Sequence, residues 1–289
     1  MSKDIEGELR SGLVALLGRP NVGKSTLLNR IVGVKVAITS PVPHTTRSRV
    51  RGVLDRPDAQ LVFVDTPGMH KPKTPLGSHL NETASHTIHD VDVCVLMVEA
   101  DAPIGKGDRF IAERLPAGTV VAVNKIDRAD RAGVLEHLAT AAGELGLGEA
   151  EYFPISARTG TGVGELVEHL VSRMATGPRY FPPGMVSDVP EAFFVAELVR
   201  EQLISHAGEE LPHSIACRVT EWEWPRIRCE ILVERESQKG IVIGRSGSVL
   251  KAAGIAVRKQ LPPGAYLELF VKVEKSWQRH PELFERLGY

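Results

Sequence analysis

One segment constrains the fold of this chain more than any other: Gly18-Arg19-Pro20-Asn21-Val22-Gly23-Lys24-Ser25. It follows a short apolar run, Leu13–Leu17, and precedes a stretch with helical periodicity, Thr26–Val32. The pattern G-x-x-x-x-G-K-S between a strand and a helix is typical of a phosphate-binding loop. Glycine lets backbone N–H groups approach a phosphate, Lys24 adds positive charge, and Ser25 offers a hydroxyl to Mg²⁺. We therefore expect a nucleotide site at the end of a buried strand.

Four further apolar runs have the length and composition of buried strands, and each is followed by a loop and a stretch of helical character. They are Leu61–Asp65, Val91–Val98, Val120–Asn124 and Tyr152–Ser156. Strands that alternate with helices indicate a mostly parallel sheet with helices on both faces, which is an α/β fold. Ligands of such sheets bind at the carboxyl ends of the strands, and the motifs described next lie there.

Two motifs complete a magnesium site in this interpretation. Asp65-Thr66-Pro67-Gly68 ends a strand, so that Asp65 can hold Mg²⁺ through water and the Gly68 amide can meet a γ-phosphate. His44-Thr45-Thr46-Arg47 lies in a polar loop between the phosphate loop and Asp65. We expect one of its threonines to complete the metal shell, and we favour Thr46 over Thr45. The predicted metal ligands are thus Ser25, Thr46 and Asp65.

We expect residues at two other strand ends to recognise the base of the nucleotide. Asn124-Lys125-Ile126-Asp127 follows the run VVAVN, where Asp127 can accept hydrogen bonds from N1–H and the 2-amino group of guanine, which adenine does not offer. Asn124 can brace the loop, and the stem of Lys125 can cover the base. Ser156-Ala157 ends the last run, and we expect an amide there to donate to guanine O6. The predicted ligand is therefore GTP or GDP with Mg²⁺.

The order and spacing of these elements, with the segment ITSPVPHTTRSRVRGV, resemble the translation-factor-like GTPases that include the Era family. Met69 stands where many such GTPases carry a glutamine that positions water, so we expect slow intrinsic hydrolysis. Asn21 resembles the asparagine of potassium-dependent relatives, which implies a K⁺ ion near the phosphates. We expect Lys24, Thr46, Gly68 and Asn21 to act in catalysis.

Composition and local charge describe the rest of the chain. The stretch GPRYFPPGMVSDVP predicts a linker at 177–190, between a GTPase domain at 1–176 and a smaller α+β domain at 191–289. The formal net charge is −1, so an RNA partner must be inferred from local charge placement. Three widely spaced cysteines indicate neither a metal site nor disulfides, and without an apolar leader we expect a cytoplasmic protein.

The second domain contains a G-x-x-G loop, Gly244-Arg245-Ser246-Gly247, between two apolar helical segments. Such loops clamp nucleic-acid backbones in KH domains. Five basic residues and no acidic residue lie between Ser237 and Leu267. We expect RNA contacts from Lys239, Gly244, Arg245, Ser246, Gly247 and Lys251. Trp222 and Trp224, in the acidic and aromatic stretch between two strands, can stack bases, but we favour packing at a hairpin edge.

With its flanking segments, this part closely resembles the type II KH domain of the Era family, and the resemblance covers essentially the whole chain. It implies binding near the 3′ end of small-subunit ribosomal RNA, help in maturation of that subunit, a monomeric state and peripheral association with the inner face of the cell membrane. A tRNA-modification GTPase shares the T-T-R segment but has another appended domain. A passive RNA-binding scaffold that holds GTP without turnover is the alternative from another class.

Overall fold

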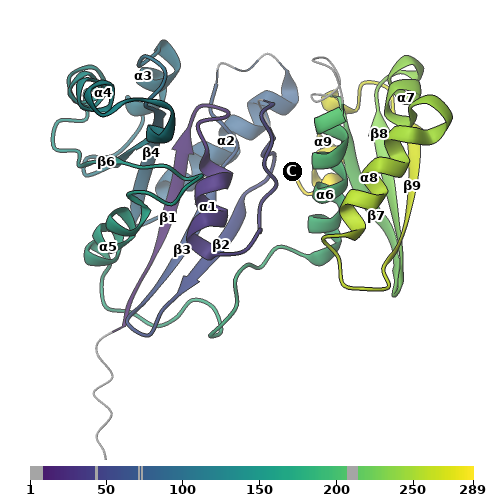
Figure 1. The fold of residues 1–289 in the computed structure, drawn as a ribbon, viewed down its shortest axis with the longest axis horizontal. Coiled ribbons are helices and arrows are strands. Elements are labelled where there is room, and N and C mark those ends of the chain that lie inside the picture. Colours follow the sequence, from purple (N-terminus) through teal and green to yellow (C-terminus); the bar gives the residue numbers. More distant parts are fainter. Residues whose placement is uncertain (1–8, 43–44, 71, 73, 207–213) are drawn as a thin grey trace, which may run out of the picture. The chain divides into compact units, whose positions relative to one another are not determined.

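The computed structural model describes residues 9–42, 45–70, 72, 74–206 and 214–289. The chain forms two compact units, and Figure 1 colours it by residue number from purple at the N-terminus to yellow at the C-terminus. The first unit comprises Met1–Ala37, Thr46–Lys71 and Leu80–Asp188. The second comprises Ile38–Thr45, Pro72–His79 and Val189–Tyr289. Two short segments of the N-terminal half are therefore counted with the second unit.

The first unit is built on a six-stranded sheet of order β2-β3-β1-β4-β5-β6. Five strands are parallel, and β2 at the edge runs antiparallel to β3. The strands are β1 (Arg10–Gly18), β2 (Val50–Asp55), β3 (Ala59–Asp65), β4 (Val93–Glu99), β5 (Val120–Asn124) and β6 (Tyr152–Pro154). The predicted α/β class with a mostly parallel sheet is confirmed; β2 was not predicted.

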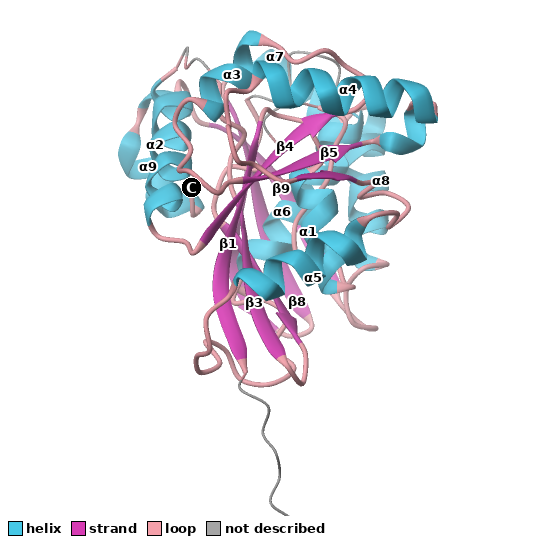
Figure 2. Cartoon of the chain, turned by 90° about the vertical axis from the view of Figure 1, so that its left-hand side faces the viewer, coloured by secondary structure: helices cyan, strands magenta, loops and turns pink. Residues whose placement is uncertain are grey.

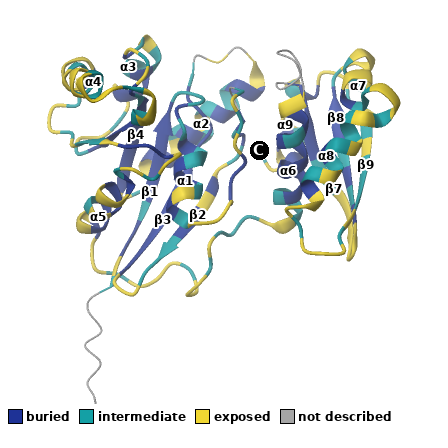
Figure 3. Cartoon of the chain, in the orientation of Figure 1, coloured by how far each residue is buried: buried dark blue, intermediate teal, exposed yellow. Residues whose placement is uncertain are grey.

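Helices cover both faces of this sheet, as Figures 1 and 2 show. Residues of α2, α3 and α4 share one core with β1, β4 and β5, centred on Leu96, Ile111 and Val121, while α1 and α5 lie on the other face. The inner strands are buried on both sides (Figure 3), which is why they read as continuous apolar runs. The helices are α1 (Lys24–Val32), α2 (Pro75–His89), α3 (Lys106–Ala112), α4 (Arg131–Glu144) and α5 (Val163–Arg173), with a 3₁₀ turn η1 (Ile126–Arg128).

The proline-rich segment up to Asp188 lies against the edge of this sheet. Gln60, a buried residue of β3, accepts hydrogen bonds from the amides of Tyr180 and Phe181 and donates to the carbonyl of Phe181. The amide of Val53 in β2 donates to the carbonyl of Val186 at 2.9 Å. The segment 177–188 thus has little regular structure, and it contacts β3 through Tyr180 and β2 through Val186.

The second unit packs three helices on one face of a three-stranded sheet, in which β8 is antiparallel to β7 and parallel to β9. The core joins α6, α7 and α8 to the inward-facing residues of the sheet, such as Cys229 and Ile231. The elements are α6 (Glu191–His206), β7 (Ala216–Glu223), β8 (Arg226–Val233), α7 (Glu236–Ile243), η2 (Arg245–Gly247), α8 (Ser248–Arg258), β9 (Tyr266–Val273), η3 (Trp277–Arg279) and α9 (Pro281–Leu287). The predicted smaller α+β unit is confirmed.

Two details differ from expectation. The β7–β8 hairpin forms as predicted, but Trp224 at its end is 52% exposed, so the prediction that it packs at the hairpin edge is wrong. Among the described residues, the run Glu236–Arg258 is long and apolar enough to cross a membrane by composition. Its helical path breaks at Ser246, which has a left-handed φ of 52°, so α7 and α8 are separate helices.

Candidate functional site

The phosphate loop connects β1 to α1 and leaves the first turn of the helix open. Gly23 precedes α1 in a left-handed conformation (φ 104°), with no side-chain cap and no acidic residue in the first turn. A Cβ on Gly23 would lie 2.3 Å from Nδ2 of Asn124, so only glycine fits there. The uncapped N–H groups and the helix dipole together favour an anion at this position.

Lys24 is buried beneath the loop. Its Nζ donates to the carbonyl oxygens of Gly18 and Arg19, both at 3.0 Å. Burial lowers the pKa of Lys24 to about 8, although the nearby Asp65 carboxylate raises it in part. An ammonium group held by two neutral carbonyls retains charge for an anion, which fits the predicted role of Lys24.

Ser25, Thr46 and Asp65 come together where α1, the Thr46 loop and β3 meet. The Ser25 hydroxyl donates to Oδ2 of Asp65 at 2.5 Å, and the Thr46 hydroxyl lies 3.0 Å from Ser25 Oγ and 3.3 Å from the same carboxylate oxygen. Thr45 is turned elsewhere, since its hydroxyl donates to the carbonyl of Val42 at 2.7 Å. The geometry therefore supports Thr46 over Thr45.

The Asp65 carboxylate fits a hydrated magnesium ion. Within the part of the chain that the structure describes, Oδ1 of Asp65 is buried and has no hydrogen-bond partner. Burial raises the pKa of Asp65 to about 6, against the opposing effects of Lys24, Ser25 and Thr46. A buried carboxylate with one oxygen left open and two hydroxyls beside the other is the type of oxygen set that Mg²⁺ prefers.

Gly68 approaches the phosphate loop closely. A Cβ on Gly68 would lie 2.7 Å from the backbone nitrogen of Pro20, so a larger residue would push the two loops apart. The preceding Thr66 is fixed by its hydroxyl, which donates to the carbonyl of Leu16 at 2.8 Å. The end of the segment Asp65–Gly68 therefore lies against the phosphate loop that follows β1.

Asn124 connects the phosphate loop to the base-reading loops. Its Nδ2 donates to the carbonyl of Val22 at 2.7 Å, and its Oδ1 accepts the amide N–H of Ala157 at 2.9 Å. The amide of Ser156 donates to the carbonyl of Thr161 at 2.8 Å. Both amides of the Ser156-Ala157 pair are thus engaged within the protein, and donation from one of them to guanine O6 stays a prediction. In this structure the pair braces Asn124.

Asp127 lies at the same edge of the sheet, in the middle of η1. Its carboxylate accepts the hydroxyl of Ser156 at 2.5 Å and forms an ion pair with Arg158. The hydrogen bond from Ser156 is the main reason that the pKa of Asp127 lies below its usual value, and the charge of Arg158 adds to it. Asp127 is therefore an ionised acceptor at neutral pH, as reading of guanine requires.

Ion pairs that the motifs do not predict surround these loops. Lys125, in a left-handed conformation (φ 69°), pairs with Glu99 at the end of β4. Arg19 of the phosphate loop binds buried Asp108 at 2.8 Å. Sequence reasoning missed Glu99, Asp108 and Arg158. The position of Glu99 at a strand end was the one available signal.

Three predicted site residues contribute no side chain. Val22 and Met69 are 0% and 2% exposed, and Met69 belongs to the core of the first unit. Ile126 packs against the same core. These positions belong to the site through their backbone alone, because apolar side chains next to a polar loop are more stable in the core. Asn21 has a left-handed φ of 66° within the phosphate loop.

The G-x-x-G loop of the second unit joins α7 to α8. Gly244 (φ 72°) and Gly247 (φ 77°) are in conformations that favour glycine, and Ser246 between them is also left-handed. A Cβ on Gly244 would lie 2.6 Å from Cγ2 of Val249 and 2.9 Å from the amide nitrogen of that residue. The loop exposes Arg245 and Ser246 to solvent, so its backbone is accessible to a partner.

The surface beside this loop is basic and partly apolar. Ile241 on α7 and Ile255 on α8 are 53% and 39% exposed. Across the described ranges, the five basic residues of this region form no ion pair, in contrast to the paired arginines of β7 and β8; they are Lys239, Arg245, Lys251, Arg258 and Lys259. Unpaired cations beside exposed apolar side chains suit the backbone and bases of a single strand.

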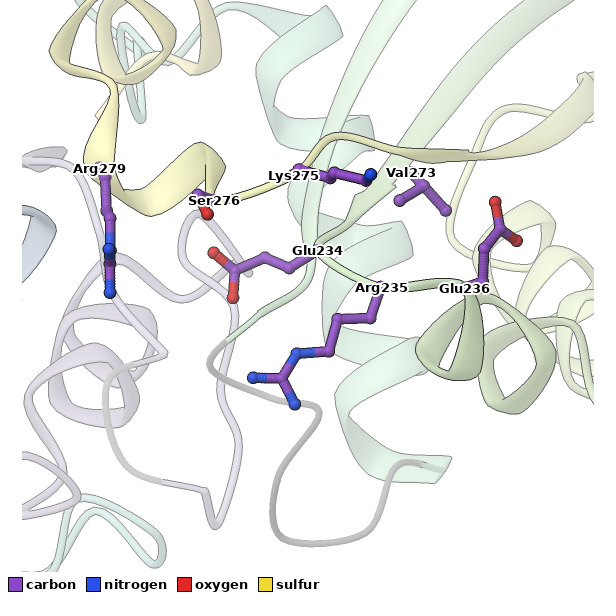
Figure 4. Close-up of a pocket in the computed structure, with 7 residues that line it drawn as sticks. All are labelled: Glu234, Arg235, Glu236, Val273, Lys275, Ser276 and Arg279. Atoms are coloured by element: carbon purple, nitrogen blue, oxygen red, sulfur yellow. The ribbon is translucent and has the colours of Figure 1, made fainter.

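A cavity of about 590 Å³ lies where β8 and β9 end (Figure 4). Arg235, Lys275 and Arg279 line it, together with Glu234 and Glu236. Two carboxylates nearly balance three cations, so this cavity lacks the uniform positive charge of the G-x-x-G loop and α8.

The fold and the two sites define a P-loop GTPase domain followed by a KH domain. A family model described as "50S ribosome-binding GTPase" matches residues 13–125, and one described as "KH domain" matches residues 210–278. GTPase Era of Mycobacterium tuberculosis is 45% identical over 98% of this chain and 99% of its own length, and that of Mycobacterium avium is 44% identical with the same coverage. The chain belongs to the Era family of GTPases.

Solved structures agree with this assignment. A crystal structure of Era in complex with MgGDPNP and nucleotides 1506–1542 of 16S ribosomal RNA is similar, with a TM-score of 0.92, 37% identity, and coverage of 97% of this chain and 99% of that chain. A variant of Aquifex aeolicus Era bound to GDP·AlF₄⁻ has a TM-score of 0.89 and 37% identity over the same shares.

Proposed function

We propose that this protein hydrolyses GTP to GDP and phosphate with Mg²⁺ and binds small-subunit ribosomal RNA, assisting maturation of that subunit. The observation that carries the proposal is that Ser25, Thr46 and Asp65 converge beside the N-terminus of α1, which has no side-chain cap. The same chain has a G-x-x-G loop without a side-chain cap between α7 and α8. The similar Era structures hold MgGDPNP with 16S ribosomal RNA in one case and GDP·AlF₄⁻ in another, which supports both activities.

Each part of the first site has a role in this proposal. The first turn of α1 and Lys24 bind the β- and γ-phosphates, while Ser25, Thr46 and Asp65 hold the metal. Mg²⁺ supplies charge that stabilises the phosphate oxygens as the bond to the leaving group breaks. Asp127 accepts hydrogen bonds from guanine. Asn124 links the loops around Asp127 to the phosphate loop.

Hydrolysis also needs a positioned water, and Met69 does not supply a group for it because its side chain is in the core. We propose that K⁺ held with the help of Asn21 adds positive charge at the phosphates, and that turnover remains slow without a partner. The conformation of Asn21 within the phosphate loop supports this role.

Phosphate release from GTP, with ATP as the competing substrate, tests the enzyme proposal. We expect slow steady-state turnover of GTP alone, no turnover of ATP, and faster turnover when small ribosomal subunits are added. Lys24→Ala serves as the inactive control because it removes the charge beneath the loop. A folded protein that binds GTP but releases no phosphate in either condition would favour the passive RNA-binding scaffold.

RNA binding is proposed through Lys239, Gly244, Arg245, Ser246, Gly247 and Lys251, on the loop and its two flanking helices. The backbone of the loop takes a phosphate, and the unpaired cations add affinity that depends on salt. Cytoplasmic location, a monomeric state and peripheral membrane association remain predictions. Cell fractionation, with and without a salt wash, and sedimentation of the purified protein test them.

A further inference from the structure

Glu99, in the first unit, lies between the two loops that are expected to bind the nucleotide. It is the last residue of β4, the strand between β1 and β5, and it is in register with Asn124 of β5. The amide of the next residue, Ala100, donates to the carbonyl of Asn124 at 2.7 Å. The backbone of Glu99 is therefore fixed at the end of the sheet where both loops begin.

The two carboxylate oxygens of Glu99 bind residues of different loops. Oε1 pairs with the ammonium group of Lys125, and Oε2 lies 3.7 Å from Nη2 of Arg19 in the phosphate loop. Arg19 is itself anchored, since its Nε donates to Oδ1 of buried Asp108 at 2.8 Å. Oδ2 of Asp108 accepts the amide N–H of Gly105, which precedes α3, at 2.8 Å. A connected series of charged groups thus runs from the start of α3 through Arg19 and Glu99 to Lys125.

The direction of the Lys125 side chain depends on its partner. The backbone of Lys125 has a left-handed φ of 69°, which is uncommon for a residue with a long side chain and persists where neighbouring contacts hold it. Burial lowers the pKa of Lys125, and the charges of Arg128 and Arg19 act in the same direction, against that of Asp127. Because a lysine stem is flexible, the carboxylate that binds its ammonium group decides where the stem lies.

Stability alone is a weak reason for this pair. The side chains of Lys125 and Glu99 are 18% and 17% exposed, so both charges have lost most of their contact with water. The cost of that loss offsets much of the attraction between two opposite charges. The place of the pair, at the start of the loop that carries Asp127, favours a role in binding.

From these contacts we infer that Glu99 is a positioning residue for guanine binding. By holding the ammonium group of Lys125, it keeps the methylene stem of that side chain in the place where it covers the face of the base. A lysine stem can lie along an apolar surface while its charge stays with a polar partner. This inference rests on the proposed function, in which Asp127 and Lys125 recognise the base.

Glu99→Gln tests the inference, because the amide keeps the shape of the side chain and removes its charge. We expect the Kd for GDP to rise roughly tenfold, mainly through faster release, since losing a hydrogen bond between charged groups typically costs about that factor. KM for GTP should rise in parallel while kcat at saturating GTP stays at the wild-type value, because Lys24, Ser25 and Asp65 are untouched. Stopped-flow fluorescence with a labelled GDP measures affinity and release.

A double-mutant cycle with Lys125→Met shows whether Glu99 acts through Lys125. Lys125→Met keeps an unbranched apolar stem and removes the ammonium group, so we expect a similar loss of GDP affinity. Adding Glu99→Gln to Lys125→Met should then cause no further loss, because the interaction is already gone. Losses that add in full would mean that Glu99 acts by another route, which overturns the inference.

Asp101→Asn is the matched control. Asp101 pairs with Arg128 at 3.4 Å, so this variant removes one negative charge near the same loop without changing the partner of Lys125. We expect wild-type GDP affinity. An equal loss in Asp101→Asn and Glu99→Gln would show a general effect of charge and overturn the inference.

Two further outcomes are decisive. Wild-type GDP affinity in a folded Glu99→Gln protein would refute the inference and leave the proposed function intact, whereas a wild-type protein that binds neither GDP nor GTP would refute the proposed function itself. Should Glu99→Gln fail to fold, Glu99→Asp decides, since it keeps the charge on a shorter side chain. We expect a smaller loss of GDP affinity in Glu99→Asp with kcat unchanged, and wild-type affinity there would overturn the inference.

Discussion

The pKa of Asp65 in the first unit is subject to opposing effects. Burial raises its pKa to about 6 while Lys24, Ser25 and Thr46 act in the other direction. A carboxyl whose pKa is higher in the folded state than in the unfolded state stabilises the fold below the unfolded value, and this contribution is lost as pH rises through the folded value. Without metal, the ionised form is therefore a cost to the fold.

The first prediction follows from this sign. In the absence of Mg²⁺ and nucleotide, the stability of wild type relative to Asp65→Asn should decrease as pH rises from about 4 to about 7, by on the order of 2–3 kcal/mol. Urea unfolding of both proteins across this range measures the difference, which cancels the titration of other groups. Adding Mg²⁺ and GDP should reverse the trend for wild type. A pH-independent difference would mean that Asp65 is not desolvated as described.

Asp127 gives a prediction about nucleotide choice. Asp127→Asn should shift preference from GTP toward xanthosine triphosphate by roughly 100-fold or more, because the amide now donates where the carboxylate accepted. Competition binding measures the shift. Arg158→Ala is the control, since it removes the ion pair with Asp127 and leaves the carboxylate. Wild-type selectivity in Asp127→Asn would contradict the guanine assignment.

A third prediction concerns the monovalent cation. If Asn21 helps to hold K⁺, replacing KCl by NaCl at equal ionic strength should lower wild-type turnover roughly tenfold, since a lost charge at the phosphates costs transition-state stabilisation. Asn21→Ala should be slow in both salts. Equal wild-type rates in the two salts would rule out this role for Asn21.

At the scale of elements, the sequence predicts what depends on local pattern. The strands that end at Asp65 and Asn124, and the strand that precedes Ser156, follow from apolar runs. β2 was missed because a single edge strand with exposed positions lacks such a run. The hydrogen bond from the Ala157 amide to Asn124 was also unpredictable, since it joins residues far apart in the chain.

The element-scale prediction concerns the loop between α7 and α8. Gly244→Asp with Gly247→Asp adds bulk at two left-handed positions and two negative charges toward an RNA backbone. We expect at least a roughly tenfold loss of affinity for RNA from the 3′ end of the small-subunit ribosomal RNA, with GDP binding kept. Arg245→Ala should lose less affinity and reduce the slope of log affinity against log salt by about 1. Fluorescence anisotropy measures both, and unchanged binding by the folded double variant would place RNA elsewhere.

At the scale of the whole molecule, the division into units does not follow the chain in one pass. The segments Ile38–Thr45 and Pro72–His79 are counted with the second unit although they lie in the N-terminal half, and the docked segment up to Asp188 is counted with the first. A domain boundary inferred from composition, such as 176/177, cannot identify these segments. Composition shows where the character of the chain changes, but not which residues each segment contacts.

The segment docked along β2 has a consequence for how the protein is made. The amide of Val53, on the outer side of an edge strand, is paired with a carbonyl from Val186, more than a hundred residues later in the sequence. During synthesis the whole sheet exists before that partner emerges, and an exposed strand edge invites pairing with other chains. The edge of β2 in a nascent chain is therefore open to pairing with other chains until the segment with Val186 has been synthesised. A fragment ending at Thr176 should precipitate under conditions in which one ending at Asp188 stays in solution.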